Sequence, residues 1–200
     1  MTDNEWDAFA AEWDTNEDAH SYSEKAFESL TNKVLPLLSN LPKSRVLDFG
    51  CGTGLLTEKL AAHCGQVVAV DTSATMIEVL KRKVLQAGTE NIVGLNIAVD
   101  AATTMDNPVL SKKFDLIVAS SVCSFLPDYE ATLLDLAVIM NTDAYFVQWD
   151  WLADMPMPRI RNALKTSGLV EQYVDQVFAM KSNGDSMPVV MGIGKLKSPS

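Results

Sequence analysis

Three alternate glycines follow a short apolar segment near the end of the first quarter of the chain. The segment 46–49 is β-prone, Gly50, Gly52 and Gly54 come next, and from residue 53 onward apolar side chains recur at helical spacing. A strand, a glycine turn and a helix form the layout of a nucleotide-binding βα unit, in which backbone N–H groups and the helix N-terminus are bare. Glycine also allows positive φ and a close approach of ligand to backbone. This stretch therefore predicts an α/β protein with a ligand at the turn; a turn that serves chain geometry alone is the alternative.

The side chains around the turn disfavour a dinucleotide. The fingerprint G-x-G-x-x-G would need a glycine at position 55, where the chain has the bulky Leu55. Asp48, two residues before the first glycine, would repel a phosphate and suits an ammonium group or a water network. A ligand with a ribose, a cationic end and no phosphate fits these residues better.

The segment D-F-G-C-G-T-G at residues 48–54 resembles motif I of the class I S-adenosylmethionine (SAM)-dependent methyltransferases. The resemblance extends over residues 40–197 and is most specific at this motif. It implies SAM as the cofactor and S-adenosylhomocysteine (SAH) as the product. It also implies cofactor contacts at the motif residues Asp48, Gly50, Cys51, Gly52 and Gly54.

Further acids at the ends of predicted strands extend this cofactor site. Asp71 ends the predicted strand 66–70 and lies 19 positions beyond Gly52, close to the roughly 20-residue spacing of a ribose-binding acid. A helix N-cap is the alternative for Asp71, although Thr72 or Ser73 can take that role. The resemblance places Asp100, after the third strand, at the adenine amino group and the Ala101 N–H at a ring nitrogen. It adds Thr72, Met76, Ser120 and Trp13 to the cofactor contacts.

The order of predicted elements favours one three-layer αβα sandwich over residues 1–200. With 48% apolar residues the chain can bury a sizeable core, and strands over 46–49, 66–70, 92–99, 114–119 and 145–149 alternate with helices. A terminal hairpin of 170–180 and 188–196, joined through 182–185, matches the resemblance, which implies a mostly parallel seven-stranded sheet with an antiparallel last strand. We expect a core of 41–197 and an N-terminal helical lid of 1–40.

The expected lid contains two helices. The first is predicted over 4–13, where apolar side chains recur at helical spacing: Trp6, Phe9, Ala10 and Trp13. A capping box from Ser21 to Glu24 predicts the start of the second helix. Its inward residues are expected at 26, 27, 30, 34 and 37, and it should end or kink near Pro36. In the resembled family this region commonly closes over the cofactor, which favours a lid that carries Trp13 and Tyr22. Aromatic anchoring of a terminal helix in the core remains the alternative.

The acceptor site is expected at the ends of the fourth and fifth strands. The loop 120–128 resembles the family's post-strand loop, but it lacks an N/D-P-P-Y/F/W tetrapeptide, and Ser124 and Phe125 stand where many small-molecule relatives have histidines. Methyl transfer needs alignment more than a nucleophile, and a base only where the acceptor is protonated. The predicted catalytic residues are Asp150, Ser124 and Tyr22; the alternative is that Trp149 and Trp151 are core and Asp150 caps a turn. Further base candidates are Asp14, His20 and Asp128.

Charge limits the partners. The net charge of −10 disfavours a nucleic-acid substrate, since the one dense basic run, residues 81–83, reads as a solvated helix face. No apolar run is long enough to span a membrane, the N-terminus is acidic, and three irregularly spaced cysteines indicate neither disulfides nor a metal site. We therefore expect a cytoplasmic monomer or homodimer that acts on a small neutral or cationic methyl acceptor, without nucleic acid, membrane or metal.

Three alternatives to a small-molecule methyltransferase stay open. They are a non-catalytic SAM-binding regulator or adaptor, a methyltransferase that acts on a protein side chain, and a nicotinamide-dependent oxidoreductase. Leu55 and the absence of a Tyr-x-x-x-Lys pair disfavour the oxidoreductase.

Overall fold

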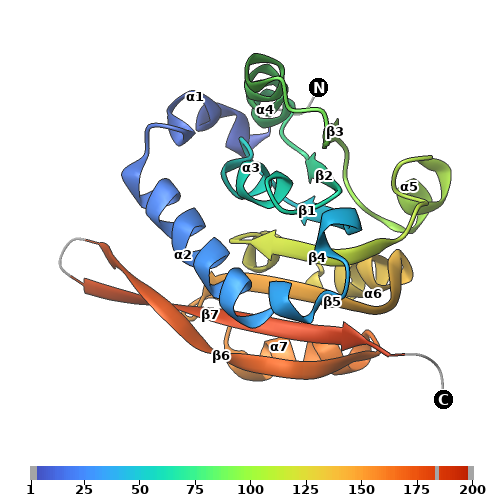
Figure 1. The fold of residues 1–200 in the computed structure, drawn as a ribbon. Coiled ribbons are helices and arrows are strands. Elements are labelled where there is room, and N and C mark those ends of the chain that lie inside the picture. Colours follow the sequence, from blue (N-terminus) through green and yellow to red (C-terminus); the bar gives the residue numbers. More distant parts are fainter. Residues whose placement is uncertain (1–3, 183–184, 198–200) are drawn as a thin grey trace. The chain divides into compact units, whose positions relative to one another are not determined.

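The computed structural model of the protein describes residues 4–182 and 185–197 (Figure 1). The strands form a seven-stranded sheet in the order β3-β2-β1-β4-β5-β7-β6. Strand β7 runs antiparallel to both β5 and β6, whereas the pairs β1–β2, β2–β3 and β4–β5 are parallel. The expected α/β fold with an antiparallel last strand inserted into the sheet is confirmed. The chain divides into two compact units, residues 1–98 and 99–200, which are described in turn.

The first unit is built from βα repeats. Its strands are β1 (Arg45–Phe49), β2 (Gln66–Asp71) and β3 (Ile92–Asn96), and its helices α3 (Leu55–Ala61) and α4 (Ala74–Ala87) connect them. The runs 46–49 and 67–70 are buried throughout, as parallel strands covered on both faces require. Strand β3 ends at Asn96, three residues before the predicted end. The N–H of Ile97, the next residue, donates to the carbonyl of Asp71 at 3.0 Å.

The N-terminal region differs from the prediction at both helices. The expected helix 4–13 is a 3-10 turn, η1 (Glu5–Ala8), followed by one α-helical turn, α1 (Ala10–Trp13), and Phe9 between them is 54% exposed rather than inward. The capping box from Ser21 to Glu24 is wrong, because α2 (Glu17–Lys33) begins earlier: the Asn16 side chain accepts the N–H groups of residues 18 and 19. Helix α2 ends before Pro36, as predicted.

Two short 3-10 helices, Leu35–Leu37 and Leu41–Lys43, follow α2 and lead into β1. Leu37, predicted to face inward, is 54% exposed. Proline at the second position of each turn has no N–H to pair, which suits these brief elements better than a continued α-helix.

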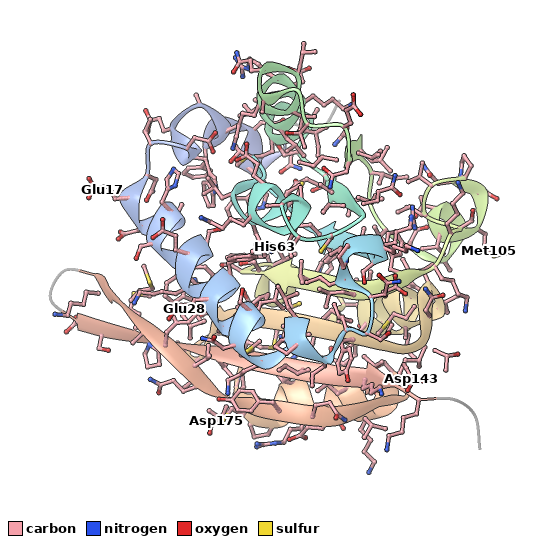
Figure 2. The ribbon with its side chains drawn as sticks, viewed as in Figure 1. Glu17, Glu28, His63, Met105, Asp143 and Asp175 are labelled. Carbon is pink, nitrogen blue, oxygen red and sulfur yellow. The ribbon has the colours of Figure 1, made fainter. Side chains whose placement is uncertain are left out.

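The second unit contains the remaining strands and three helices. In chain order these are α5 (Ala101–Asp106), β4 (Phe114–Ser120), the 3-10 turn η4 (Cys123–Phe125), α6 (Tyr129–Val138), β5 (Met140–Trp151), α7 (Met157–Thr166), β6 (Leu169–Ser182) and β7 (Asp185–Leu196). The terminal hairpin is confirmed, while residues 183 and 184 of its predicted turn lie outside the described residues. Met105 on α5 and Asp143 on β5 point outward (Figure 2).

Candidate active site

In the glycine turn between β1 and α3, one glycine is required by packing and another has space beside its Cα. Gly50, Gly52 and Gly54 have φ of 69°, 53° and 92°, in the left-handed region. A Cβ at Gly54 would lie 2.4 Å from Cδ1 of Leu80, so this glycine is required by packing against α4. A Cβ at Gly52 would meet only the indole Nε1 of Trp13, at 3.7 Å. The face of Gly52 is thus open toward the N-terminal region.

Backbone N–H groups of the turn are mostly used within the protein. Gly50 and Cys51 donate to the carbonyl of Val70 at 2.9 and 3.0 Å, and Gly54 donates to the carbonyl of Cys51 at 3.0 Å. Gly52 donates to Oδ2 of Asp71 at 2.8 Å. A pyrophosphate would find few free donors here and a carboxylate nearby, so the turn is unsuited to a dinucleotide.

Asp71 joins the two loops that follow β1 and β2. Its Oδ2 accepts the Gly52 N–H, and its Oδ1 accepts the Ser73 N–H at 2.8 Å. Ser73 is the N-cap of α4, because its hydroxyl accepts the Met76 N–H at 3.1 Å, so the predicted cap is taken by Ser73. Asp71 nevertheless has backbone partners of its own: each of its oxygens accepts one N–H and keeps a further lone pair for a hydroxyl donor. Burial raises the pKa of Asp71, and these N–H donors oppose the rise.

Asp48 is a buried carboxyl at the end of β1, directly below the turn. It is 1% exposed, and its Oδ2 accepts the Thr57 hydroxyl of α3 at 2.6 Å. Burial raises the pKa of Asp48 to about 7; the Thr57 hydroxyl lowers it and the negative charge of Asp71 raises it further. Burial and the same two carboxylates also raise the pKa of the Cys51 thiol well above its ordinary value.

The segment 4–16 is attached to both loops by polar side chains. Asn4 donates to the Thr72 hydroxyl at 3.0 Å, and Asp7 accepts the Ser73 hydroxyl and the Thr75 N–H. The ring of Trp13 lies edge-on to that of Trp6 at 6.3 Å between centroids, and its Nε1 lies 3.7 Å from where a Cβ of Gly52 would stand. These contacts make the segment a cover over the loops that carry the predicted cofactor residues.

Asp14 and Lys83 fasten the cover to the glycine turn. Asp14 accepts the Thr53 hydroxyl and forms an ion pair with Lys83 at 3.1 Å. Lys83 also donates to the Thr53 carbonyl at 3.1 Å and pairs with Glu58 at 2.8 Å. The prediction of a solvated basic face is wrong for Lys83, which is half-buried, because two carboxylates and a carbonyl converge on its ammonium group.

The second unit contains another buried carboxyl, Asp150 on β5. Its Oδ1 accepts the Ser124 N–H at 3.1 Å, and its Oδ2 accepts the Gln148 amide at 2.8 Å, while the Gln148 carbonyl accepts the Tyr129 hydroxyl. Burial raises the pKa of Asp150 to about 7, and these donors lower it. The Ser124 hydroxyl is buried and makes no hydrogen bond of ordinary geometry within the described chain, although it lies near enough to Asp150 to lower that pKa.

The other predicted site residues are distributed over both units. Asp100 is exposed and caps α5 through a reciprocal capping box with Thr103. Asp128 caps α6, and His20 Nε2 lies 2.7 Å from the Asp14 carbonyl. Tyr22 is buried on α2, Met76 is buried on α4, Ser120 is half-buried at the end of β4 and Ala101 is exposed. The first unit thereby brings together Trp13, Asp48, Gly50, Cys51, Gly52, Gly54, Asp71, Thr72 and Met76.

Sequence reasoning missed several partners of these residues. Thr57 had a signal, since it is a polar residue beside Leu56 and Leu60 on the buried face of α3. The Asp14–Lys83 pair had none, because its members are far apart in the chain and of ordinary surface types. Tyr129 and Gln148 meet only after β5 and α6 have packed.

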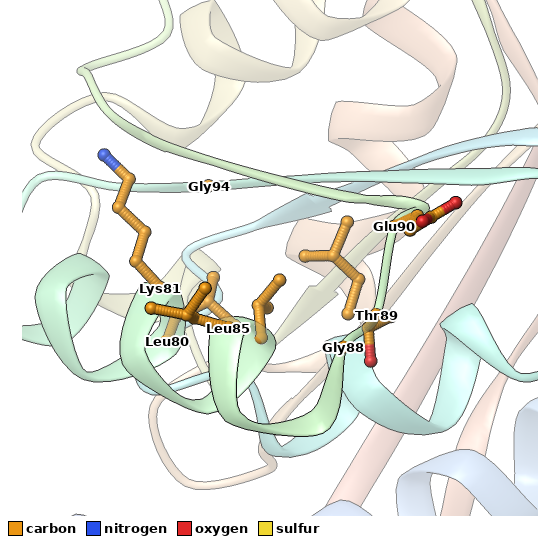
Figure 3. A pocket seen from close by; sticks show the side chains of 9 residues that line it. Leu80, Lys81, Leu85, Gly88, Thr89, Glu90 and Gly94 are labelled. Carbon is orange, nitrogen blue, oxygen red and sulfur yellow. The ribbon is translucent and has the colours of Figure 1, made fainter.

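A hollow in the first unit lies away from the predicted site. It is found beside the C-terminal half of α4 and β3 and contains none of the predicted cofactor residues (Figure 3). The glycine turn is the better candidate for a ligand site, because the hollow presents few converging polar groups. Its lining residues are Leu80, Lys81, Val84, Leu85, Gly88, Thr89, Glu90, Ile92 and Gly94.

Comparison with known proteins identifies the family. Residues 47–146, half of the chain, match the family model described as a methyltransferase domain. The chain belongs to this family. Among curated relatives, a ubiquinone biosynthesis O-methyltransferase of Chelativorans sp. is 35% identical over 86 residues, 43% of this chain and 32% of that protein. One from Nitrosomonas europaea is 25% identical over 114 residues, 57% and 46% of the two chains. This methyltransferase chain thus matches less than half the length of these relatives.

Solved structures share the fold of this methyltransferase over nearly its whole length. A methyltransferase in complex with the Trm112 methyltransferase activator of Haloferax volcanii gives a TM-score of 0.74 at 14% identity, covering 99% of this chain and all of that one. The N-methyltransferase NodS of Bradyrhizobium japonicum, in complex with SAH, gives 0.69 at 16% identity, covering 98% and 100%. The expected membership of the class I SAM-dependent methyltransferases is confirmed.

The residues of the first unit fit SAM as the cofactor. The open face of Gly52 permits close approach of a ligand, and Asp71 keeps acceptor capacity for ribose hydroxyls. Asp48 offers a buried carboxyl without a cationic partner in the described chain, which suits a ligand with a positive end. In the part of the chain that the structure describes, no group of His, Cys, Asp and Glu is arranged to hold a metal ion. Within that same part, no helix is both long and apolar enough to cross a bilayer.

Proposed function

We propose that this methyltransferase moves the methyl group of SAM to a small neutral or cationic acceptor by in-line displacement. One observation carries the proposal: a glycine turn whose N–H groups are largely satisfied lies between two carboxyls, Asp48 and Asp71, and has one open face at Gly52. Such a site favours a ligand with hydroxyls and a positive charge over one with phosphates. Donor and acceptor alignment is then the main contribution of the protein.

The proposed cofactor contacts follow from the first unit. Asp71 accepts the ribose hydroxyls while it holds the two loops together, and Asp48 faces the cationic end. Trp13 closes over Gly52 from the covering segment. The sulfonium of SAM supplies an activated methyl group, so no nucleophilic side chain is needed. Further proposed contacts are those of Gly50, Cys51, Gly54, Thr72, Met76, Asp100, Ala101 and Ser120.

The proposed acceptor residues are Ser124, Tyr22 and Asp150. The buried Ser124 hydroxyl is a polar group without a hydrogen bond of its own in the described chain, which suits contact with a polar acceptor. Asp150 receives the Ser124 N–H and therefore acts as a positioning residue for the loop that carries Ser124. A net charge of −10 favours neutral or cationic acceptors over polyanions.

The remaining features of the proposal concern partners. We expect a small-molecule acceptor, no nucleic acid, no membrane, and a cytoplasmic monomer or homodimer. The relatives include an O-methyltransferase and an N-methyltransferase by their names, so the acceptor atom is a question for experiment.

Transfer of labelled methyl groups tests the proposal. The protein is incubated with methyl-labelled SAM and a pool of small metabolites, and the labelled products are identified by a mass increase of one methylene. Asp71→Ala should lose labelling, whereas Glu12→Gln, an exposed change in the cover, should keep it. SAM binding without any labelled product would instead support a non-catalytic regulator, and labelling confined to anionic acceptors would contradict the proposed acceptor class.

A further inference from the structure

Asp48 is a buried carboxyl with no cationic partner among the described residues. The carboxyl is 1% exposed and accepts one hydrogen bond, from the Thr57 hydroxyl. A buried carboxylate with so little compensation is costly, and the usual response of such a group is to keep its proton. The free protein therefore holds Asp48 largely in its neutral form at mildly acidic pH.

Within residues 4–182 and 185–197, the groups that act on Asp48 include no cation. The group on β2 that acts on it is the carboxylate of Asp71, which adds negative charge, and the turn contributes the Cys51 thiol, which stays protonated. From α3 it receives the neutral Thr57 hydroxyl. The ammonium of Lys83, which contacts the glycine turn at the Thr53 carbonyl, is paired with Asp14 and Glu58.

We propose that Asp48 releases its proton to solvent when SAM binds, so that its carboxylate becomes the counter-charge for the positive end of the cofactor. The inference rests on the proposed function, because it takes SAM as the ligand. No covalent bond of the cofactor changes in this step: the carboxyl O–H breaks, water or buffer takes the proton, and the carboxylate remains beside the bound cation. Cofactor binding then depends on pH, unlike binding to a carboxylate that is already ionised.

The direction of the pH dependence follows from linkage. Burial raises the pKa of Asp48 to about 7 in the free protein, and a neighbouring cation lowers the pKa of a carboxyl. Below pH 7 binding must expel the proton, so the affinity for SAM should rise about tenfold per pH unit until pH approaches 7 and then level off. A carboxylate with an ordinary pKa would give a flat profile over this range.

Calorimetric titration counts the proton directly. SAM is titrated into the whole chain at pH 6 in buffers of different ionisation enthalpy, and the slope of binding enthalpy against ionisation enthalpy gives the protons released. We expect close to one for wild type and a clear drop for Asp48→Asn. Asp150→Asn, which alters the other buried carboxyl of raised pKa, is the matched control and should keep the release. At pH 6 the amino group of SAM, whose ordinary pKa is about 7.7–8.0, stays protonated and contributes little.

A second variant and a second ligand keep the test decisive where Asp48→Asn fails to fold. Thr57→Val removes the hydrogen bond to the carboxylate and should move the midpoint of proton release to higher pH. 5′-Methylthioadenosine, which has neither sulfonium nor ammonium, should release no proton. SAM binding without proton release, or with release unchanged in Asp48→Asn, would overturn the inference and leave the proposed cofactor intact. No binding of SAM at all would overturn the proposed function itself.

Discussion

Asp48 and Asp150 are both buried acids at the ends of parallel-paired strands, yet they differ in the number of hydrogen-bond donors that their carboxyl groups receive. Asp150 receives a backbone N–H from Ser124 and an amide N–H from Gln148, so each of its oxygens has a fixed donor. Among the described residues, Asp48 accepts one hydrogen bond from a hydroxyl and none from an N–H. Burial raises the pKa of both acids to about 7. We propose that its two donors fix Asp150 within the fold, whereas Asp48, with a single donor among the described residues, is left to meet a ligand.

The first prediction tests whether the glycine turn above Asp48 is a ligand site. Gly52→Val should raise the dissociation constant for SAM at least about a thousandfold, about 4 kcal/mol, because the new side chain fills the open face of the turn. Strain at φ +53° should cost about 1–2 kcal/mol of folding free energy. Calorimetric titration and urea unfolding measure the two quantities.

Gly88→Val is the matched control for that change. Gly88 has φ +64° in the same unit, and a Cβ there meets nothing within 4 Å. Both variants should lose similar stability, and only Gly52→Val should lose SAM. Loss of folding in Gly52→Val alone would make this glycine structural, like Gly54.

The second prediction tests whether Asp150 stabilises the fold rather than binding the cofactor. Asp150→Ala leaves the Ser124 N–H and the Gln148 amide without their acceptor, and two such buried donors should cost about 3 kcal/mol of unfolding free energy. SAM affinity should change by less than about twofold, well within 0.5 kcal/mol. An Asp150→Ala protein of wild-type stability in urea unfolding would remove the contrast with Asp48.

The third prediction concerns Asp71, which combines both roles. Asp71→Ala removes the bonds to Gly52 and Ser73 and the proposed bonds to the ribose, so SAM affinity should fall at least about tenfold, or 1.4 kcal/mol. Ser73 still caps α4, so the fold should survive. Unchanged SAM affinity in a folded variant would restrict Asp71 to joining the two loops.

The smallest expected effect on SAM binding comes from the Asp14–Lys83 ion pair that attaches the cover, the segment 4–16, to α4. Lys83→Met removes the ion pair to Asp14, and partly exposed pairs contribute little free energy, so SAM dissociation should speed up about two- to fivefold. Stopped-flow displacement measures the rate. Lys81→Met, a change at an exposed residue two positions earlier on α4, should leave the rate unchanged. Equal rates in both variants would mean that the ion pair does not hold the cover.

Local patterns in the sequence predicted most of the fold, including the glycine turn that carries the candidate site. The strand and glycine turn at 46–54, Asp71 at the end of β2 and the terminal hairpin depend on neighbours close in sequence or on strand order, and the structure has them as predicted. The start of α2 was misplaced because Asn16 is an earlier cap that competes with Ser21. The extent of a single domain with residues 1–40 as its lid stays a prediction.

Contacts between distant residues could not be predicted in the same way. The Asp14–Lys83 pair and the Tyr129–Gln148–Asp150 chain depend on helices meeting strands after folding, and their residue types are common on any surface or core. The number of donors that each buried acid receives is likewise a property of packing. The sequence therefore predicts Asp48 as a cofactor contact and Asp150 as a catalytic residue, but it does not show how many donors each carboxyl receives.

Titration of the Asp48 carboxyl carbon by NMR tests the central claim most directly. In the free protein its pKa should lie near 7, because burial disfavours the charged form. Saturation with SAM should lower that pKa by at least two units, about 2.7 kcal/mol of interaction, while the Asp150 signal keeps its midpoint. Equal midpoints for Asp48 with and without SAM would contradict the account.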